Sequence, residues 1–141
     1  GFVWVKLNPK AHVIYKVLPD KVKQVIIHGG TKFGMGFWSH QSTELCLLAT
    51  RGHPHRVSRK IDNLILAPVT THSSKPREAY HRMVALCGDL PRISLFARPP
   101  IPAGWIGTGL DFDGLDIRDA LPALASNIYL PEVVPYEAEA Q

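Results

Sequence analysis

Two cations at the ends of expected structural elements point to an anion-binding site. Lys75 lies within His72–Glu78, directly before a proline that suits the start of a helix, and Arg98 follows the apolar run Ile93–Phe96. A lysine at a helix N-terminus faces the positive end of the helix dipole, which costs about 0.3 kcal/mol or more. Lysine and arginine together suit a carboxylate or a phosphate, which arginine can bind through two parallel hydrogen bonds. The alternative is that each cation pairs with a local acid such as Glu78.

A loop rich in glycine and aromatic residues, Phe33–His40, is the second candidate site. Exposed rings stack on unpaired bases, so this loop predicts a contact with nucleic acid, although aromatic residues also pack in protein cores. Gly107-Thr108-Gly109 could let backbone approach a cofactor, but such a short pattern more often marks a turn. The seven histidines and two cysteines do not have the spacing of metal ligands, so we predict no metal site.

These residues need a scaffold, and the hydrophobic pattern predicts an α/β fold. We expect four strands, the second of them buried, at Phe2–Leu7, Glu44–Thr50, Leu64–Val69 and Ile93–Phe96. The apolar residues of His12–Leu18 fit either a strand or a helix, and Lys21–Ile27 fits neither clearly. A short helix is expected within Asp116–Ala125.

An amphipathic helix is predicted from Pro76 to Gly88, since proline suits the first helical position and glycine the C-terminal cap. Its buried stripe is expected at Tyr80, Met83, Val84 and Cys87. Together with the strands on either side, this helix predicts a strand–helix–strand unit, which joins parallel strands. Ligands bind at the carboxyl ends of such strands, so Lys75 and Arg98 should meet at one edge of the sheet.

Length and composition suit one globular domain. The chain has 141 residues, of which 45% are hydrophobic and 20% charged. Its apolar runs are too short to span a bilayer, so we expect a cytoplasmic protein that does not bind a membrane. Cys46 and Cys87 are expected as reduced core residues. The expected boundaries are a domain over residues 1–130 and a loose acidic tail over residues 131–141.

Charge is distributed unevenly along the chain. Residues 1–60 carry ten Lys and Arg against two acids, whereas residues 111–141 hold seven acids and one arginine. A basic surface beside an acidic tail suits an anionic partner, and nucleic acid is the first candidate. A solvated basic face is the alternative.

Five blocks of the chain, in this order, resemble the later part of the MT-A70 family. They are Gly34–Trp38, Thr43–Gly52, His72–Glu78, Ile93–Arg98 and Gly104-Trp105, within roughly residues 1–115. Members of this family transfer a methyl group from S-adenosylmethionine to the exocyclic amine of adenine in RNA or DNA. The blocks look closer to the bacterial and phage DNA-modifying branch than to the messenger-RNA enzymes. The resemblance implies a Rossmann-like S-adenosylmethionine-dependent methyltransferase fold, of which these residues form the later half of the sheet.

The resemblance also implies roles for individual residues. Lys75 is expected to contact the methionine carboxylate of the cofactor, and Phe96 and Arg98 to lie at the end of the cofactor-binding strand. In Gly109-Leu110-Asp111, only Asp111 offers a polar contact to the cofactor. The target base is expected near Gly36, Phe37 and Trp38.

Three departures from the family pattern bear on activity. Ser94 stands where the family usually carries an acid, and Leu110 stands where it often carries asparagine. The family's Asp-Pro-Pro-Trp motif, which positions the adenine amine for transfer, does not occur in this sequence. Because the chain opens inside an expected strand without an initiator methionine, we expect it to be part of a longer protein whose upstream half carries that motif.

Three readings follow from this. The first is an adenine methyltransferase acting on DNA, with RNA possible, whose residues printed here are inactive without the upstream half. The second is a noncatalytic relative that serves as a nucleic-acid-binding or scaffolding partner. The third is an unrelated small α/β binding domain, in which the ordered blocks are a coincidence.

Overall fold

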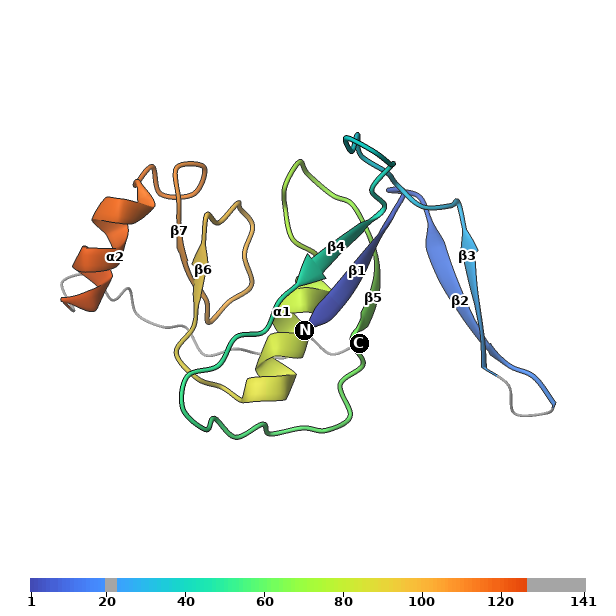
Figure 1. Ribbon diagram of the computed structural model, residues 1–141, viewed down its shortest axis with the longest axis horizontal. Coiled ribbons are helices and arrows are strands. Elements are labelled where there is room, and N and C mark those ends of the chain that lie inside the picture. Colours follow the sequence, from blue (N-terminus) through green and yellow to red (C-terminus); the bar gives the residue numbers. More distant parts are fainter. Residues whose placement is uncertain (20–22, 127–141) are drawn as a thin grey trace. The chain divides into compact units, whose positions relative to one another are not determined.

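The computed structural model describes residues 1–19 and 23–126. The chain divides into two compact units, Gly1–His72 and Ser73–Gln141, and each is considered by itself. Within the described residues the elements are short strands and two helices (Figure 1). The expected tail over residues 131–141 lies outside the described part, as does the boundary at residue 130.

A three-stranded sheet forms the centre of the first unit. Strand β1 (Phe2–Leu7) lies in the middle, antiparallel to β4 (Thr43–Cys46) and parallel to β5 (Leu64–Pro68) (Figure 1). Trp4 and Ile65 lie opposite each other in the parallel pair, and both side chains are buried. The predicted strands at Phe2–Leu7 and Leu64–Val69 are therefore confirmed, although β5 ends one residue earlier than expected.

The prediction of a buried strand over Glu44–Thr50 is wrong in both length and burial. β4 ends at Cys46, and the side chains of Leu45 and Leu47 are exposed. Among the described residues β4 pairs only with β1. A short apolar run does not reveal whether its strand will have one neighbour or two, or whether another layer will cover it.

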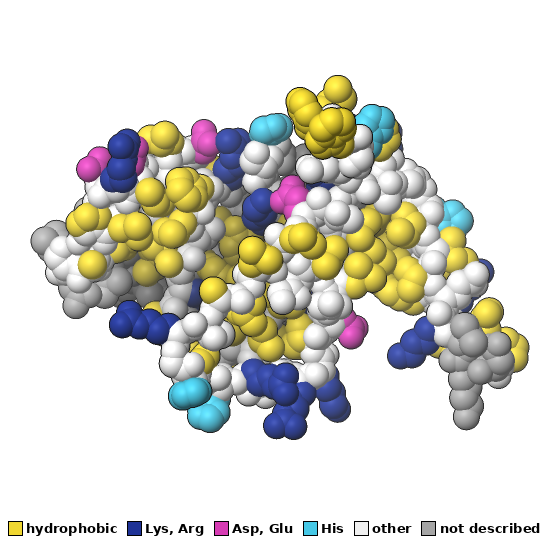
Figure 2. All heavy atoms as spheres, in the orientation of Figure 1, with side chains coloured by type: hydrophobic (Ala, Val, Ile, Leu, Met, Phe, Trp, Pro, Cys, Tyr) yellow, Lys and Arg dark blue, Asp and Glu magenta, His cyan; other side chains and the backbone are white. Residues whose placement is uncertain are grey.

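A separate antiparallel pair is formed by β2 (His12–Val17) and β3 (Lys23–His28). Here the strand interpretation of the ambiguous segment holds, because each strand supplies the other with hydrogen bonds and side-chain contacts. The imidazole rings of His12 and His28, for instance, stack with centroids 5.0 Å apart. Figure 2 shows a group of hydrophobic side chains exposed over the loop that follows β3.

The second unit contains α1 (Arg77–Cys87), β6 (Ile93–Leu95), β7 (Ile106–Thr108) and α2 (Ile117–Ala125). Both predicted helices are confirmed. Pro76 is the N-cap of α1 rather than its first helical residue, since its backbone is extended (φ −65°, ψ 139°). Asp116 caps α2 by accepting a hydrogen bond from the backbone N–H of Arg118 at 2.9 Å.

Helix α1 ends at Gly88, the glycine predicted as its C-terminal cap. Gly88 has φ 86°, and its N–H donates to the carbonyl of Val84 at 2.7 Å. A positive φ of this kind is easily adopted only by glycine. The predicted stripe is confirmed in part, because Tyr80 is buried and Met83 and Val84 are half-buried, whereas Cys87 is exposed.

The expected parallel pairing of the strands on either side of α1 stays a prediction, because β5 and β6 belong to different units. In the described part of the chain β5 pairs with β1, whereas β6 pairs in parallel with β7. Strand β7 was not predicted, since its residues Gly107 and Thr108 belong to a pattern that more often marks a turn. The mixed α/β class is confirmed, and the Rossmann-like arrangement stays a prediction.

Both cysteines are free thiols, as expected, but neither is a core residue. Cys46 ends an edge strand and Cys87 is the last residue of α1, and both side chains are exposed. Neither position is covered by another element of its own unit. In the described residues, neither helix combines the length and the apolar character needed to cross a membrane.

Candidate functional site

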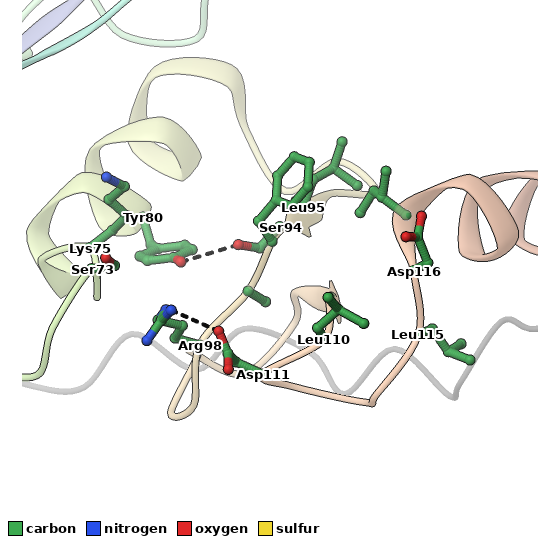
Figure 3. A pocket seen from close by; sticks show the side chains of 14 residues that line it. Ser73, Lys75, Tyr80, Ser94, Leu95, Arg98, Leu110, Asp111, Leu115 and Asp116 are labelled. Carbon is green, nitrogen blue, oxygen red and sulfur yellow. Dashed lines mark hydrogen bonds and ion pairs between the residues drawn. The ribbon is translucent and has the colours of Figure 1, made fainter.

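A pocket of about 480 Å³ lies in the second unit (Figure 3). Its walls come from the segment before α1, from α1 itself, from β6 and the residues after it, and from the loop between β7 and α2. The volume lies in the range of pockets that hold small molecules and cofactors, about 300–1,000 Å³. The four residues expected at a cofactor, which come from three separate stretches of the sequence, all line it: Lys75, Phe96, Arg98 and Asp111.

Lys75 reaches the pocket from just outside helix α1. It precedes the N-cap Pro76, so it lies one residue before the helix end rather than in the first turn. The backbone of Lys75 therefore lies beside the positive end of the helix dipole, which like the lysine charge favours an anion. In Figure 3 the side chains of Ser73 and Lys75 lie at the same end of the pocket.

Arg98 and Asp111 form an ion pair within the pocket wall (Figure 3). The distance from Arg98 Nη2 to Asp111 Oδ2 is 2.7 Å, and the side chains are 36% and 60% exposed. The alternative that Arg98 pairs with an acid thus holds, but the acid comes from the loop after β7. Glu78, the acid named in that alternative, pairs with Arg82 at 2.6 Å. A pair this exposed contributes about 1 kcal/mol or less to stability, so its main consequence is to orient Arg98.

Tyr80 connects α1 to β6 at the pocket. Its hydroxyl lies 3.2 Å from the hydroxyl of Ser94, and both residues line the pocket. The edge-to-face contact between Tyr80 and Trp105, with centroids 4.8 Å apart, holds the phenol ring in place. The sequence places Tyr80 only in the buried stripe of α1. The signal that could have identified it is its hydroxyl, since a buried tyrosine usually finds a polar partner.

The ends of β6 and β7 approach each other closely. Ala97 N–H donates to the carbonyl of Thr108 at 2.9 Å, and Gly109 follows with φ 148°. A Cβ atom on Gly109 would lie 2.8 Å from the Cα atom of Phe96. Phe96 itself has a positive φ of 54°, and its side chain is exposed while lining the pocket. Gly109 therefore permits two backbone segments to approach each other closely. This role differs from both interpretations of Gly107-Thr108-Gly109 drawn from the sequence, an approach to a cofactor and a turn.

Asp113 holds the loop that carries Asp111 into the pocket. Its Oδ1 accepts the backbone N–H groups of Gly109 at 3.0 Å and Leu115 at 3.1 Å. These hydrogen bonds, the first above all, lower the pKa of Asp113 below its ordinary value of 3.8. Asp113 was not predicted from the sequence, although Asp113-Gly114 is a typical turn pair in which the aspartate accepts hydrogen bonds from nearby backbone N–H groups.

We expect low pH to break the hydrogen bonds by which Asp113 holds the loop between β7 and α2. Because the pKa of Asp113 is lowered on folding, its stabilising contribution is present above pH 3.8 and is lost as the pH falls through the lower folded value. We expect the amide proton shifts of Gly109 and Leu115 in an NMR titration to change together, with a midpoint below pH 3.8. Asp113→Asn should abolish this shared titration. Midpoints that differ, or that lie above this value, would contradict the assignment.

The residues expected near a target base lie in the first unit, in the loop between β3 and β4. Phe37 and Trp38 are 92% and 93% exposed and make an edge-to-face contact at 5.2 Å. Neither ring therefore packs in the core of its own unit. Gly36 is half-buried in a tight turn, since a Cβ atom there would lie 2.1 Å from the carbonyl oxygen of Ser39. Their role in binding a base stays a prediction.

The sequence is similar to known proteins over most of its length. Residues 20–111 match the family model described as MT-A70. N(6)-adenosine-methyltransferase subunit METTL3 of Danio rerio is 30% identical over 119 residues, 83% of this chain and 18% of the relative. The N(6)-adenosine-methyltransferase MT-A70-like proteins of Drosophila melanogaster and Arabidopsis thaliana are each 31% identical, over 83% and 93% of this chain and 17% of each relative. The chain thus spans less than a fifth of the length of these relatives.

Proposed function

The chain belongs to the MT-A70 family, and we propose on this basis that its pocket binds S-adenosylmethionine. The observation that carries the proposal is the convergence of Lys75, Phe96, Arg98 and Asp111 on one pocket. All four lie within the matched residues 20–111. They come from three separate stretches of the sequence, so their convergence on one pocket supports a shared ligand.

The side chains of the pocket fit both ends of this cofactor. A carboxylate suits Lys75, and the nearby hydroxyl pair of Tyr80 and Ser94 offers neutral hydrogen bonds. The apolar side chains of Leu95 and Leu110 provide a surface for a ring or a methylene chain. When bound, S-adenosylmethionine supplies a methyl group activated by attachment to a sulfonium sulfur.

Arg98 contributes through its place in the pocket wall and its orientation. The carboxylate of Asp111 accepts from Nη2 of the guanidinium at 2.7 Å. This ion pair directs the positive charge of Arg98 along the pocket wall, where it attracts an anionic group of a ligand. We therefore assign binding to Lys75 and Arg98 and orientation to Asp111.

The proposed reaction is methyl transfer to the exocyclic amine of adenine in DNA. The relatives are named for adenosine, and DNA is preferred here because the sequence blocks resemble the DNA-modifying branch. The exposed rings of Phe37 and Trp38 suit an adenine that has been flipped out of its stack. Since Asp-Pro-Pro-Trp does not occur in these residues, the proposed partner is an upstream half of the same protein that contains it.

Two measurements test this function. Isothermal titration calorimetry of the 141-residue chain with S-adenosylmethionine tests the pocket, and heat of binding is expected. Transfer of a labelled methyl group to adenine in DNA and in RNA of the same sequence tests the reaction. We expect transfer to DNA only when a polypeptide with the Asp-Pro-Pro-Trp half is joined to the chain. Absence of cofactor binding by both the chain and the joined protein would overturn the proposal, and preferential transfer to RNA would overturn the DNA assignment.

A noncatalytic nucleic-acid-binding partner is the second candidate. It is favoured by Ser94 and Leu110 at positions where the family carries polar cofactor contacts, and by Asp111 already facing Arg98. Salt-dependent binding of DNA without any binding of S-adenosylmethionine is the result that would select it.

A further inference from the structure

The loop between β4 and β5 gathers positive charge on the first unit. We call residues 51–60 the basic loop. Its fixed cations are all exposed: Arg51, Arg56, Arg59 and Lys60. No acid lies between Glu44 and Asp62 in the sequence, and two histidines add further nitrogen donors. In Figure 2 dark-blue and cyan side chains gather along the lower edge, over this loop.

The cations of the basic loop differ from five other cations of the chain in their ion pairs. Among the residues that the structure describes, none forms an ion pair with the cations of the basic loop. Elsewhere, ion pairs with acids are made by Lys6, Arg82, Arg92, Arg98 and Arg118. The described residues of the first unit therefore leave the charge of the basic loop unneutralised.

Repulsion within this loop favours binding of a polyanion. The screening length at physiological salt is about 8 Å, so neighbouring cations of a ten-residue loop still repel one another. The loop begins with a bend at Gly52, with φ 71°, and near its end Lys60 N–H donates to Ser58 Oγ at 3.2 Å. A chain of phosphates matches cations spread along a loop better than one small anion does.

The composition of the loop favours nucleic acid over a membrane surface. Val57 is its one large aliphatic side chain, whereas membrane-surface segments present a continuous apolar face. The same unit also exposes Phe37 and Trp38, whose rings are able to stack on bases. The cations and the exposed rings of one unit together favour nucleic acid, which offers both phosphates and bases.

We propose that the basic loop binds the phosphate backbone of nucleic acid, independently of base sequence and of the cofactor pocket. This inference rests on the proposed function, since it assigns the surface that holds the nucleic-acid substrate. Phosphate contacts set affinity and position but do not read sequence. The basic loop therefore holds the nucleic-acid substrate, and residues outside the loop select the base.

The test uses a variant in which Arg51, Arg56, Arg59 and Lys60 are all changed to Gln. A matched control changes four exposed lysines of the same unit to Gln: Lys10, Lys16, Lys23 and Lys32. Binding of a fluorescent single-stranded DNA is measured by anisotropy between about 50 and 200 mM salt. Each lost contact should lower the slope of log K against log salt by about 0.7, hence by about 3 for the loop variant. Affinity at the lowest salt should fall about tenfold or more, with a clearly smaller change in the control.

Equal losses in the two variants would show a diffuse net-charge effect and overturn the inference, as would an unchanged slope in the loop variant. Loss of binding to phosphatidylserine vesicles with DNA binding retained would overturn it in favour of a membrane contact. Circular dichroism of both variants checks that they fold. Binding of S-adenosylmethionine is measured on the same samples, so that failure of the basic loop and failure of the cofactor proposal are separate results.

Discussion

Replacing Lys75 or Arg98 by alanine should weaken binding of S-adenosylmethionine about 10- to 100-fold. Both side chains line the pocket, and a hydrogen bond to a charged group contributes about 1.5–3 kcal/mol, which corresponds to this change in affinity. Isothermal titration calorimetry of each variant measures the effect.

Arg82→Ala is the matched control for this pair. It removes the same charge from α1 and also leaves an acid, Glu78, without its partner at 2.6 Å. Arg82 does not line the pocket, so its loss should leave the affinity unchanged. Wild-type affinity in both Lys75→Ala and Arg98→Ala would refute the assignment of the pocket to the cofactor.

Gly109→Ala should destabilise the second unit by about 2–4 kcal/mol, because two separate penalties add. The backbone of Gly109 has φ 148°, which side chains rarely adopt, and a Cβ atom would lie 2.8 Å from Phe96 Cα and 3.0 Å from Ala97 N. Neither neighbouring atom belongs to a flexible side chain, so the strands must separate. Chemical denaturation measures the loss, and calorimetry should show weaker cofactor binding because Phe96 lines the pocket.

Gly114→Ala is the control that measures the cost of a positive φ without a close backbone contact. Gly114 lies in the same loop with φ 77°, but a Cβ atom there meets nothing within 4 Å. It should cost about 1 kcal/mol, the strain of a positive φ alone. If Gly109→Ala cost no more than this control, the close approach of the two backbones would be wrong.

Elements with local signals were predicted well from the sequence. Helix α1 ends where Gly88 stands, and Asp116 caps α2, because capping depends on residues within one turn. Predictions that depended on distant neighbours were less successful. The strand expected at Glu44–Thr50 and the buried cysteines failed because burial depends on which element covers a segment, and a local pattern does not contain that information.

The candidate site illustrates the same division. Lys75 and Arg98 were expected together at the edge formed by two adjacent parallel strands, yet β5 and β6 belong to different sheets. They line one pocket because both flank elements of the second unit, α1 and β6, which the contact between Tyr80 and Ser94 joins. The expectation that the two residues lie at one site is confirmed, whereas the strand pairing from which it was argued stays a prediction.

The sequence by itself determined the family, the mixed α/β class and the two helices, because each depends on which residues occur and in what order along the chain. It also selected the residues that line the pocket, whose role at a cofactor stays a proposal. Only the tertiary structure decided how those residues meet. It pairs Arg98 with Asp111, joins Tyr80 to Ser94 across 14 residues of chain and lets Gly109 lie against Phe96. Such contacts form between segments whose approach is set by strand pairing and packing of the whole unit, so no local pattern contains them.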